Sequence, residues 1–308
     1  MKIGFIGLGK MGFNMVQALL EKKIKVVVFD LNKKAVKDIS KKKGAESATD
    51  LKDVIEKLPK QKIVWVMVPH GKPVDIVLNR LKTILSRGDI VIDGGNSFYE
   101  KTLKRSAEFK KRGIHFMDAG VSGGLEGARK GASIMIGGDK KIFKKTEPIF
   151  KALAIKNGYG YMGKTGAGHF VKMVHNGIEY ALLQSYAEGY QMVEKSKFDS
   201  DLREVTKVWR NGSVIRSWLL DLMQDALKKD PRLNRNSGIV CGGSTGEWTT
   251  KTARKMKNPV PMISLALRER KKSRKRTSFA SKVVAVLRLG FGGHKIPPKG
   301  KTCEELHL

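Results

Sequence analysis

The chain has 308 residues, 41% of them hydrophobic, so it is long enough for two globular domains with sizeable cores. Its longest strand-like apolar run, from Ile63 to Val68, is far shorter than the roughly 20 residues of a membrane span, and the opening residues lack a signal-peptide pattern. We therefore expect a soluble, cytoplasmic protein with no membrane partner.

The formal net charge of +32 comes from 61 basic and 29 acidic side chains. A surface of this charge attracts phosphates and nucleic acid, but the basic residues are spread along the chain instead of forming one tail. We interpret them as a solvated surface that binds nucleic acid non-specifically at most. The two cysteines, Cys241 and Cys303, belong to no paired Cys/His cluster, so we expect neither a disulfide framework nor a metal site.

Short apolar strands alternate with helical stretches in the first half. Strands are predicted at Lys2 to Ile6, Val26 to Asp30, Ile63 to Val68, Asp89 to Asp93, Ile114 to Asp118 and Ser133 to Ile136. Helical stretches such as Met11 to Lys22 and Leu31 to Lys42 complete repeated βα units. This pattern predicts an α/β fold, with a Rossmann-like, doubly wound parallel sheet over residues 1–164.

A glycine-rich motif follows the first predicted strand and opens the first helix. Its residues are Gly7, Leu8, Gly9, Lys10, Met11 and Gly12, the GxGxxG spacing of a dinucleotide-binding loop. The glycines permit a tight turn and a close approach to a pyrophosphate at the helix N-terminus. Asp30 ends the second strand, where its carboxylate binds a ribose and repels a 2′-phosphate, so NAD is favoured over NADP. Nearby Lys33 and Lys34 weaken this preference.

Two further loops follow predicted strands. One contains Asn96 and Ser97 after Asp93, and the other contains Ser122, Gly123 and Gly124. Glycine loops are usually plain turns. Ligands bind at the carboxyl ends of strands in an open α/β sheet, so we expect both loops to contact substrate.

The segment from Gly168 to Tyr180 predicts a helix with an unusual polar face. Lys172, His175, Asn176, Glu179 and Tyr180 follow the i, i+3, i+4, i+7 and i+8 spacing of one helix face. A solvated face is the alternative, but such faces repeat Lys and Glu instead of combining five different groups. The pattern therefore favours a site in which a base and an acid share one patch.

The second half is predicted to be all helical, forming a domain over residues 165–308 with a loop-like tail. Helical stretches are expected at Gly168 to Lys195, Arg203 to Trp209, Trp218 to Leu227, Thr249 to Lys255, Pro261 to Arg270 and Ser278 to Leu289. Gly163 to Gly166 marks the boundary between the halves.

These motifs together resemble the decarboxylating 6-phosphogluconate dehydrogenases, in their short form, within the β-hydroxyacid dehydrogenase superfamily. The resemblance covers nearly the whole chain. It is carried by Phe5 to Gly12, Asp93 to Ser97, Val121 to Gly124, Gly168 to Tyr180 and Arg288 to His294. The superfamily shares the first motif and the Lys172, Asn176 pair, whereas His175, Glu179, Tyr180 and the tail Arg and His are more specific to the phosphogluconate enzymes.

The resemblance implies oxidation and decarboxylation of 6-phosphogluconate to ribulose 5-phosphate and CO2 in the pentose phosphate pathway, with NAD, or alternatively NADP, as cofactor. Lys172 is then the general base, and Glu179 is the acid that protonates the enediol. The implied cofactor-binding residues are Gly7, Leu8, Gly9, Lys10, Met11, Gly12, Asp30, Val68 and Asn96. The implied substrate-binding residues are Asn96, Ser122, Gly123, Gly124, His175, Asn176, Tyr180, Thr245, Arg270, Arg288 and His294.

The resemblance also implies a homodimer or homotetramer in which Arg288 and His294 reach a neighbouring subunit. The stretch from Cys241 to Trp248 departs from the family pattern, which carries a phosphate-binding lysine or an acidic stretch there. Two alternatives stay open: a related dehydrogenase acting on an unphosphorylated acid, and a nucleic-acid-binding protein built on an inherited dehydrogenase fold.

Overall fold

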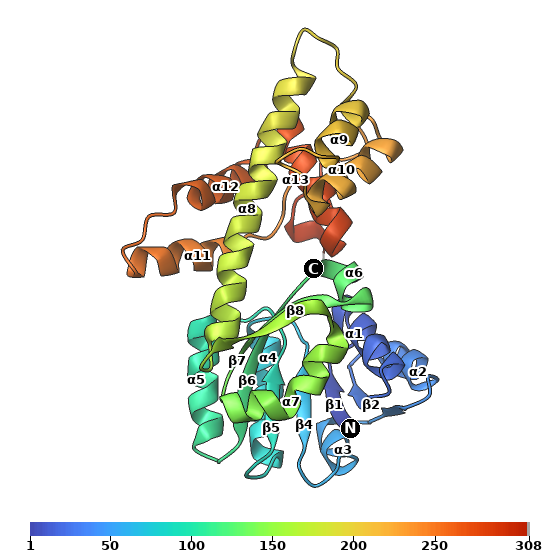
Figure 1. The fold of residues 1–308 in the computed structure, drawn as a ribbon, viewed down its shortest axis with the longest axis vertical. Helices are drawn as coiled ribbons and strands as arrows, with labels where there is room; N and C mark the ends of the chain where they lie inside the picture. Colours follow the sequence, from blue (N-terminus) through green and yellow to red (C-terminus); the bar gives the residue numbers. More distant parts are fainter. Residues whose placement is uncertain (307–308) are drawn as a thin grey trace. The chain divides into compact units, whose positions relative to one another are not determined.

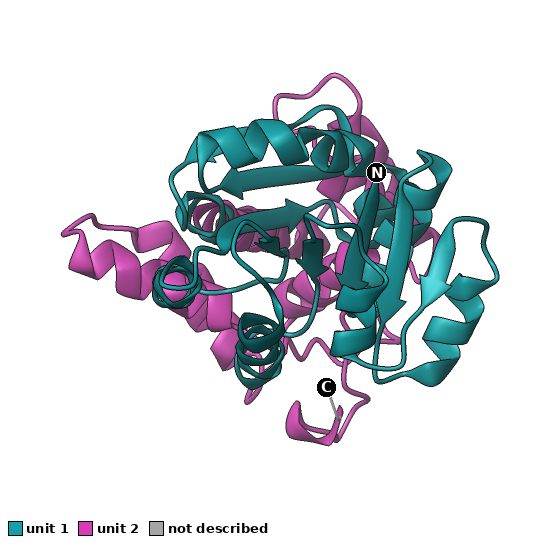
Figure 2. Cartoon of the chain, turned by 90° about the horizontal axis from the view of Figure 1, so that it is seen from below, with its two compact units in different colours: residues 1–173 teal, residues 174–308 magenta. Residues whose placement is uncertain are grey.

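The computed structural model describes residues 1–306 and divides the chain into two compact units (Figures 1 and 2). Unit 1 is Met1–Met173, and unit 2 begins at Val174. Unit 1 contains the strands, and unit 2 is helical, which confirms the predicted fold class. The division falls inside one continuous helix, α8, which runs from Ala167 to Glu194.

Within the described residues, unit 1 contains an eight-stranded sheet in the order β3-β2-β1-β4-β5-β6-β7-β8. The strands are β1 (Lys2–Ile6), β2 (Lys25–Phe29), β3 (Ala45–Ser47), β4 (Ile63–Val66), β5 (Ile90–Asp93), β6 (His115–Ser122), β7 (Ala132–Gly137) and β8 (Ala154–Gly163). The chain order reverses between β1 and β4, the type of switch point at which open α/β sheets bind ligands.

The six predicted strands are confirmed, but the sheet differs from the prediction in two respects. The pattern missed β3, which has only three residues, and β8, a half-exposed strand that contains glycines. The sheet is not wholly parallel, since β6 and β7 pair antiparallel. A parallel crossover needs about a dozen residues or more, whereas only residues 123–131 connect these two strands.

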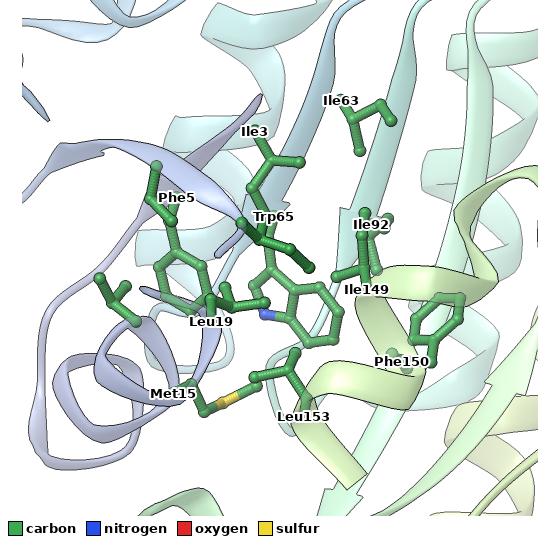
Figure 3. Close-up of a cluster of buried hydrophobic side chains, with 14 of the residues drawn as sticks. Ile3, Phe5, Met15, Leu19, Ile63, Trp65, Ile92, Ile149, Phe150 and Leu153 are labelled. Atoms are coloured by element: carbon green, nitrogen blue, oxygen red, sulfur yellow. The ribbon is translucent and has the colours of Figure 1, made fainter. Parts of the chain in front are cut away.

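The central strands are apolar because both faces of the sheet are covered by helices. Every residue of β4 and β5 is buried, as expected for parallel strands with helices on both sides. Side chains alternate between the faces, so Trp65 packs on one side with Phe5, Met15 and Phe150 (Figure 3). Val64 and Val66 belong to the core on the other side.

Seven helices precede α8 in unit 1. They are α1 (Lys10–Glu21), α2 (Lys33–Ser40), α3 (Leu51–Glu56), α4 (Lys72–Ile84), α5 (Tyr99–Lys110), α6 (Gly124–Lys130) and α7 (Lys140–Leu153). Side-chain caps begin several of them. The Asn32 side chain, for example, accepts hydrogen bonds from the backbone N–H groups of Lys34 and Ala35.

Unit 2 packs its helices around an apolar core. Besides the later part of α8, these helices are α9 (Leu202–Arg210), α10 (Trp218–Lys229), α11 (Ser244–Lys255), α12 (Pro261–Lys272), α13 (Phe279–Gly292) and the 3-10 turn η1 (Glu304–Leu306). Leu183, Met223, Val283 and Leu287 are buried together in this core. Among residues 1–306, none of the helices combines the length and the apolar content that crossing a membrane requires.

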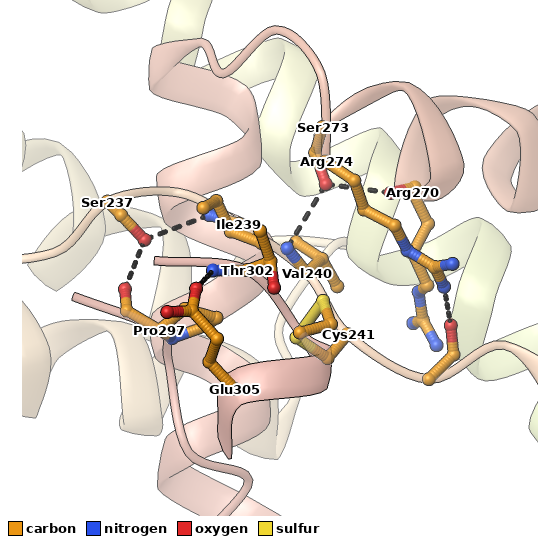
Figure 4. Close-up of a disulfide and its surroundings, with 12 residues drawn as sticks. Ser237, Ile239, Val240, Cys241, Arg270, Ser273, Arg274, Pro297, Thr302 and Glu305 are labelled. Atoms are coloured by element: carbon orange, nitrogen blue, oxygen red, sulfur yellow. Dashed lines mark hydrogen bonds between the residues drawn. A yellow bond between two sulfur atoms is a disulfide. The ribbon is translucent and has the colours of Figure 1, made fainter. Parts of the chain in front are cut away.

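The cysteines correct one expectation, because Cys241 and Cys303 form a disulfide within unit 2 (Figure 4). Their Cα atoms are 5.6 Å apart across a sequence separation of 62 residues. The expectation of no disulfide rested on the absence of a clustered cysteine pattern, and spacing along the chain says nothing about proximity in the fold. The Ser237 hydroxyl also donates to the Pro297 carbonyl at 2.6 Å, so the tail is held to the segment before α11 at two points.

Candidate active site

The glycine motif forms a tight loop that leads from β1 into α1. Gly7 has a φ of +101°, and a Cβ there would lie 2.3 Å from the Met67 carbonyl oxygen. A Cβ at Gly12 would lie 2.0 Å from the Gly7 carbonyl oxygen, so both positions require glycine. At Gly9, by contrast, the described chain leaves open space around a Cβ.

This loop suits the pyrophosphate of a dinucleotide. Gly9 is the N-cap of α1, and within the described residues no side chain caps that end and no acidic residue lies in the first turn. Neither a side-chain cap nor an acidic residue of that turn therefore offsets the positive end of the helix dipole, which favours an anion there. Lys10 and Met11 form the first turn of α1, while Leu8 is buried beneath the loop.

Asp30 follows β2 and joins the loop to a neighbouring pocket. Its carboxylate accepts hydrogen bonds from the backbone N–H groups of Leu8, at 2.5 Å, and Asn32, at 2.7 Å. The pocket, with a volume of about 690 Å³, is also lined by Val36, Ala48 and Lys33. An apolar wall beside a carboxylate suits the adenosine end of a dinucleotide, and the lysine adds positive charge at the same place.

The loop after β5 lies near the glycine loop. Val68 lies close to both loops: a Cβ at Gly7 would be 3.0 Å from Val68 Cγ1, and one at Gly95 would be 3.0 Å from the Val68 carbonyl oxygen. Asp93 is fully buried, and it accepts hydrogen bonds from the Gly95 backbone and the Ser97 hydroxyl. These bonds fix the loop while Asn96 is exposed.

Lys172 is buried against the sheet because glycines let α8 approach it. A Cβ at Gly120 of β6 would lie only 2.3 Å from the Lys172 Cβ. Gly168, at the start of α8, would clash with the Met135 carbonyl oxygen at 2.5 Å if it carried a Cβ. Lys172 is consequently only 8% exposed. Ser122 ends the same strand, and Gly123 and Gly124 follow with φ of +112° and +58°.

A buried carboxylate fixes the start of α8. Asp118 of β6 accepts hydrogen bonds from the backbone N–H groups of Gly166, at 2.6 Å, and His169, at 2.8 Å. The His169 ring is buried, and its Nδ1 lies 2.8 Å from the Thr102 hydroxyl. Sequence reasoning did not single out Asp118, His169 or Thr102. Asp118 was visible only as a polar residue ending a predicted strand.

Further along α8, in unit 2, lie the other polar residues of the predicted helix face. His175 and Asn176 are half-buried, with His175 Nδ1 3.1 Å from Asn176 Oδ1. Glu179 is half-buried, whereas Tyr180 is only 6% exposed. Gly246 of α11 lets that helix contact Tyr180, since a Cβ there would lie 2.6 Å from Tyr180 Cε1.

Unit 2 also contains a buried cationic cluster, which we call the phosphate cluster and define as Tyr180, Thr245, Arg270 and Arg288. All four residues are less than 10% exposed. The Arg270 guanidinium lies 3.4 Å from the centroid of the Tyr180 ring. Thr245 lies in the first turn of α11, whose N-cap is Gly243, and this helix N-terminus adds a positive potential that Glu247 of the same turn offsets in part.

Burial makes both arginines of the cluster costly to charge. It is the main cause that lowers the pKa of Arg270, which Tyr180 and Glu179 partly offset. Burial followed by repulsion from Arg270 lowers the pKa of Arg288 to about 10. A guanidinium keeps its proton at neutral pH even when it is buried, so the cluster is cationic, and the nearby Glu179 offsets its charge only in part.

Arg288 joins this cluster within its own chain, because α13 is anchored in the unit 2 core through Val283, Val284 and Leu287. That Arg288 and His294 reach a neighbouring subunit stays a prediction. A Cβ at Gly242 would lie 3.5 Å from Arg288 Nη2, so the guanidinium reaches the loop before α11. His294 is exposed, with its ring edge-on to Phe291 at 6.1 Å between centroids.

Comparison with known proteins gives the family. The protein-family model described as the NAD binding domain of 6-phosphogluconate dehydrogenase matches residues 2–163. The family model described as the C-terminal domain of 6-phosphogluconate dehydrogenase matches residues 168–197. The chain is 46% identical to YqeC of Bacillus subtilis, named as a candidate 6-phosphogluconate dehydrogenase, over 97% of this chain and 100% of that protein. It is 42% identical to an NAD(+)-dependent, decarboxylating 6-phosphogluconate dehydrogenase of Haloferax volcanii, over 97% and 99%.

Solved structures agree with this assignment. The Plasmodium falciparum 6-phosphogluconate dehydrogenase, determined with NADP+ and with 6-phosphogluconate, matches with a TM-score of 0.81 at 30% identity. The match covers 89% of this chain and 62% of that one. A 3-hydroxyisobutyrate dehydrogenase of Mycobacterium tuberculosis shares the fold, with a TM-score of 0.75 at 20% identity, over 93% and 99% of the two chains. The chain belongs to the 6-phosphogluconate dehydrogenase family of oxidoreductases, which use a nicotinamide cofactor.

Proposed function

We propose that this protein oxidises and decarboxylates 6-phosphogluconate to ribulose 5-phosphate and CO2, with NAD as the preferred cofactor. The observation that carries the proposal is the phosphate cluster. Two buried guanidinium groups and a helix N-terminus next to Tyr180 form a site for a compact, multiply charged anion. An unphosphorylated hydroxy acid has no group for this site.

The cofactor supplies one function, acceptance of a hydride from the substrate carbon. The glycine loop and the open end of α1 would hold its pyrophosphate, and Asp30 would accept hydrogen bonds from its ribose. A carboxylate there disfavours a 2′-phosphate, which supports NAD over NADP. The Haloferax relative is named NAD(+)-dependent, in agreement with this choice.

Lys172 is the proposed base. In its neutral form the amine would take the proton of the hydroxyl β to the carboxylate as the hydride leaves the same carbon. The resulting ketone lies β to the carboxylate, so the electrons of the breaking C–C bond move toward the carbonyl oxygen and CO2 departs. Protonated Lys172 then stabilises the enolate oxygen. Burial against Gly120 holds the side chain in position for both steps.

Glu179 is the proposed acid that completes the reaction. It lies seven residues after Lys172 on the continuous helix α8, about two turns further on. Its carboxylic acid protonates the carbon of the enediolate from which CO2 departed, and the oxygen that protonated Lys172 stabilises becomes the ketone oxygen of ribulose 5-phosphate. The substrate carboxylate and hydroxyls are proposed to be bound by Asn96, Ser122, Gly123, Gly124, His175 and Asn176. The sugar end is proposed to be bound by His294. Thr245, Tyr180, Arg270 and Arg288 are proposed to bind the phosphate.

The deciding experiment compares substrates that differ only by the phosphate. NADH formation and CO2 release are measured with 6-phosphogluconate and with gluconate, and each is repeated with NADP. We expect equal yields of NADH and CO2 and a kcat/KM at least 100-fold higher for the phosphorylated acid, the scale of two charge-assisted hydrogen bonds. Preference for gluconate or hydroxyisobutyrate would instead assign the protein to a related dehydrogenase activity.

A further inference from the structure

Arg274 is a third arginine beside the phosphate cluster, and it lies outside the motifs that predicted the site. It follows the end of α12, four residues after Arg270, so that their side chains run toward the same loop (Figure 4). Arg274 Nη2 donates a hydrogen bond to the Gly242 carbonyl. That glycine is also the one that the Arg288 guanidinium approaches.

The charges around Arg274 leave a cationic excess. Arg274 acts electrostatically on both Arg270 and Arg288, and it lowers the pKa of each. Tyr180 and then Glu179 oppose this effect on both buried arginines. Arg274 also lies near Glu304 of η1. Hydrogen bonds are the main cause that lowers the pKa of Glu304, and the positive charge of Arg274 lowers this pKa further. Unlike the two buried arginines, Arg274 is exposed.

The loop under Arg274 is also shaped for close approach. Gly242 and Gly243 have φ of +78° and +145°, and a Cβ at Gly243 would lie 3.6 Å from Arg274 Nη2. The glycines therefore let a guanidinium lie directly over the backbone that enters the first turn of α11. A phosphate held by this helix N-terminus would lie within reach of the Arg274 guanidinium.

We propose that Arg274 is a further binding residue for the substrate phosphate, closing the outer side of the site that Arg270 and Arg288 form from within. The proposal rests on the function proposed above. With three guanidinium groups, the site selects a dianionic phosphate monoester over singly charged or neutral groups. The Gly242 carbonyl holds Arg274 in place until the phosphate binds. Arg274 contacts only the phosphate end, so it affects substrate binding and not the chemical steps.

The test separates charge from structural support. Arg274→Gln keeps an N–H donor for the Gly242 carbonyl but removes the charge, whereas Arg274→Lys keeps both. We expect Gln to raise the KM for 6-phosphogluconate about tenfold with kcat changed less than twofold, and Lys to recover most of the loss. Gluconate turnover should not change. Arg276→Gln, an exposed position in the same basic segment, is the matched control and should behave as wild type.

A binding measurement with inorganic phosphate tests the role of Arg274 without relying on the proposed reaction. Its dissociation constant, measured by calorimetry without substrate, should rise about tenfold in Arg274→Gln and stay unchanged in Arg276→Gln. A wild-type protein inactive on 6-phosphogluconate would refute the proposed function, and the phosphate titration would still decide the role of Arg274. The proposal is wrong if Arg274→Gln binds phosphate as tightly as wild type. It is also wrong if Arg274→Gln keeps as much affinity for the substrate as Arg274→Lys.

Discussion

The glycine loop of unit 1 and the phosphate cluster of unit 2 are both proposed to bind a phosphate group, and they differ in the physical means that they offer for it. The glycine loop offers backbone N–H groups at a helix end and excludes side chains from the two positions where a Cβ would strike a carbonyl oxygen. The phosphate cluster offers buried guanidinium groups, which remain charged despite the cost of burial. The first site depends on shape and the second on charge, so they should fail under different substitutions.

Neither site performs the chemistry, and replacing the proposed base should therefore cause the largest loss. Lys172→Met removes the proton acceptor and the cation beside the developing oxyanion, so kcat should fall by about 100-fold or more. NADH binding and phosphate binding should both persist. Steady-state kinetics and two equilibrium titrations provide the check, with the exposed Lys195→Met as control. Near-normal turnover in a folded Lys172→Met protein would remove the lysine from this role.

Shape dependence in unit 1 can be tested with two alanine substitutions in one loop. Gly12→Ala places a Cβ 2.0 Å from the Gly7 carbonyl oxygen, so the loop must shift. NADH affinity should fall about 100-fold, the effect of roughly 3 kcal/mol of overpacking. Gly9→Ala meets open space in the described chain, so its free energy of unfolding should match wild type while NADH binding still weakens. Fluorescence titration and denaturant unfolding measure both effects.

Charge dependence in unit 2 can be tested with Arg288→Met, which keeps an unbranched side chain. The KM for 6-phosphogluconate should rise roughly 10- to 100-fold, the scale of a hydrogen bond to a charged group, with NADH affinity unchanged. Gluconate kinetics serve as the internal control. A similar loss with gluconate would mean that Arg288 supports the fold and not the phosphate.

The same variant tests the cost of burying the charge. The pKa of Arg288 is about 10 in the folded protein, well below its ordinary value, so the unfolded state binds more protons in the pH window between the two. Stability therefore rises with pH across that window, and at neutral pH the fold carries the full cost of the charge. The free energy of unfolding of Arg288→Met at pH 7 should equal or exceed that of wild type in denaturant titrations.

Replacing Asp30 should have a smaller effect, which concerns the choice between NAD and NADP. Asp30 is a charged residue beside the glycine loop, the site that otherwise depends on shape. Asp30→Ser removes the repulsion of a 2′-phosphate, and the NAD to NADP ratio of kcat/KM should fall about tenfold. Asp38→Ser, at a half-buried position of α2 that does not line the pocket beside Asp30, is the control. The carboxylate also accepts two backbone hydrogen bonds, so a modest loss of stability is expected in Asp30→Ser alone. A preference for NADP in the unmodified protein would contradict the proposed cofactor.

The periodic spacing of apolar and polar residues in the sequence was enough to predict the strands and helices of unit 1 and the helix α8. The strand and helix alternation predicted the Rossmann-like unit, and the five-residue face predicted α8, because both depend on repeats of 2 and 3.6 residues. The antiparallel pairing of β7 did not emerge, although the short connection from residue 123 to 131 already argued against a parallel crossover.

Local sequence patterns could not predict contacts between segments that lie far apart in the chain. In the sequence Gly120 stands just before the predicted ligand loop of Ser122, Gly123 and Gly124, and only the fold shows that it makes room for Lys172. Arg274 was one of several basic residues in its segment, and its position over Gly242 depends on how α12 packs. The two cysteines pair because the tail returns to the loop before α11, a contact that sequence spacing cannot indicate.

That cystine turns part of unit 2 into a covalent ring. Residues 241 to 303 close on themselves, and the ring contains Thr245, Arg270, Arg274 and Arg288. A protease that cuts once inside it would leave all three arginines that we propose to bind phosphate attached to the rest of the protein. The break would become visible on a denaturing gel only after a thiol reductant opens the bond. Nicked and intact protein would otherwise migrate together, so a preparation judged whole without reductant can already contain cleaved chains.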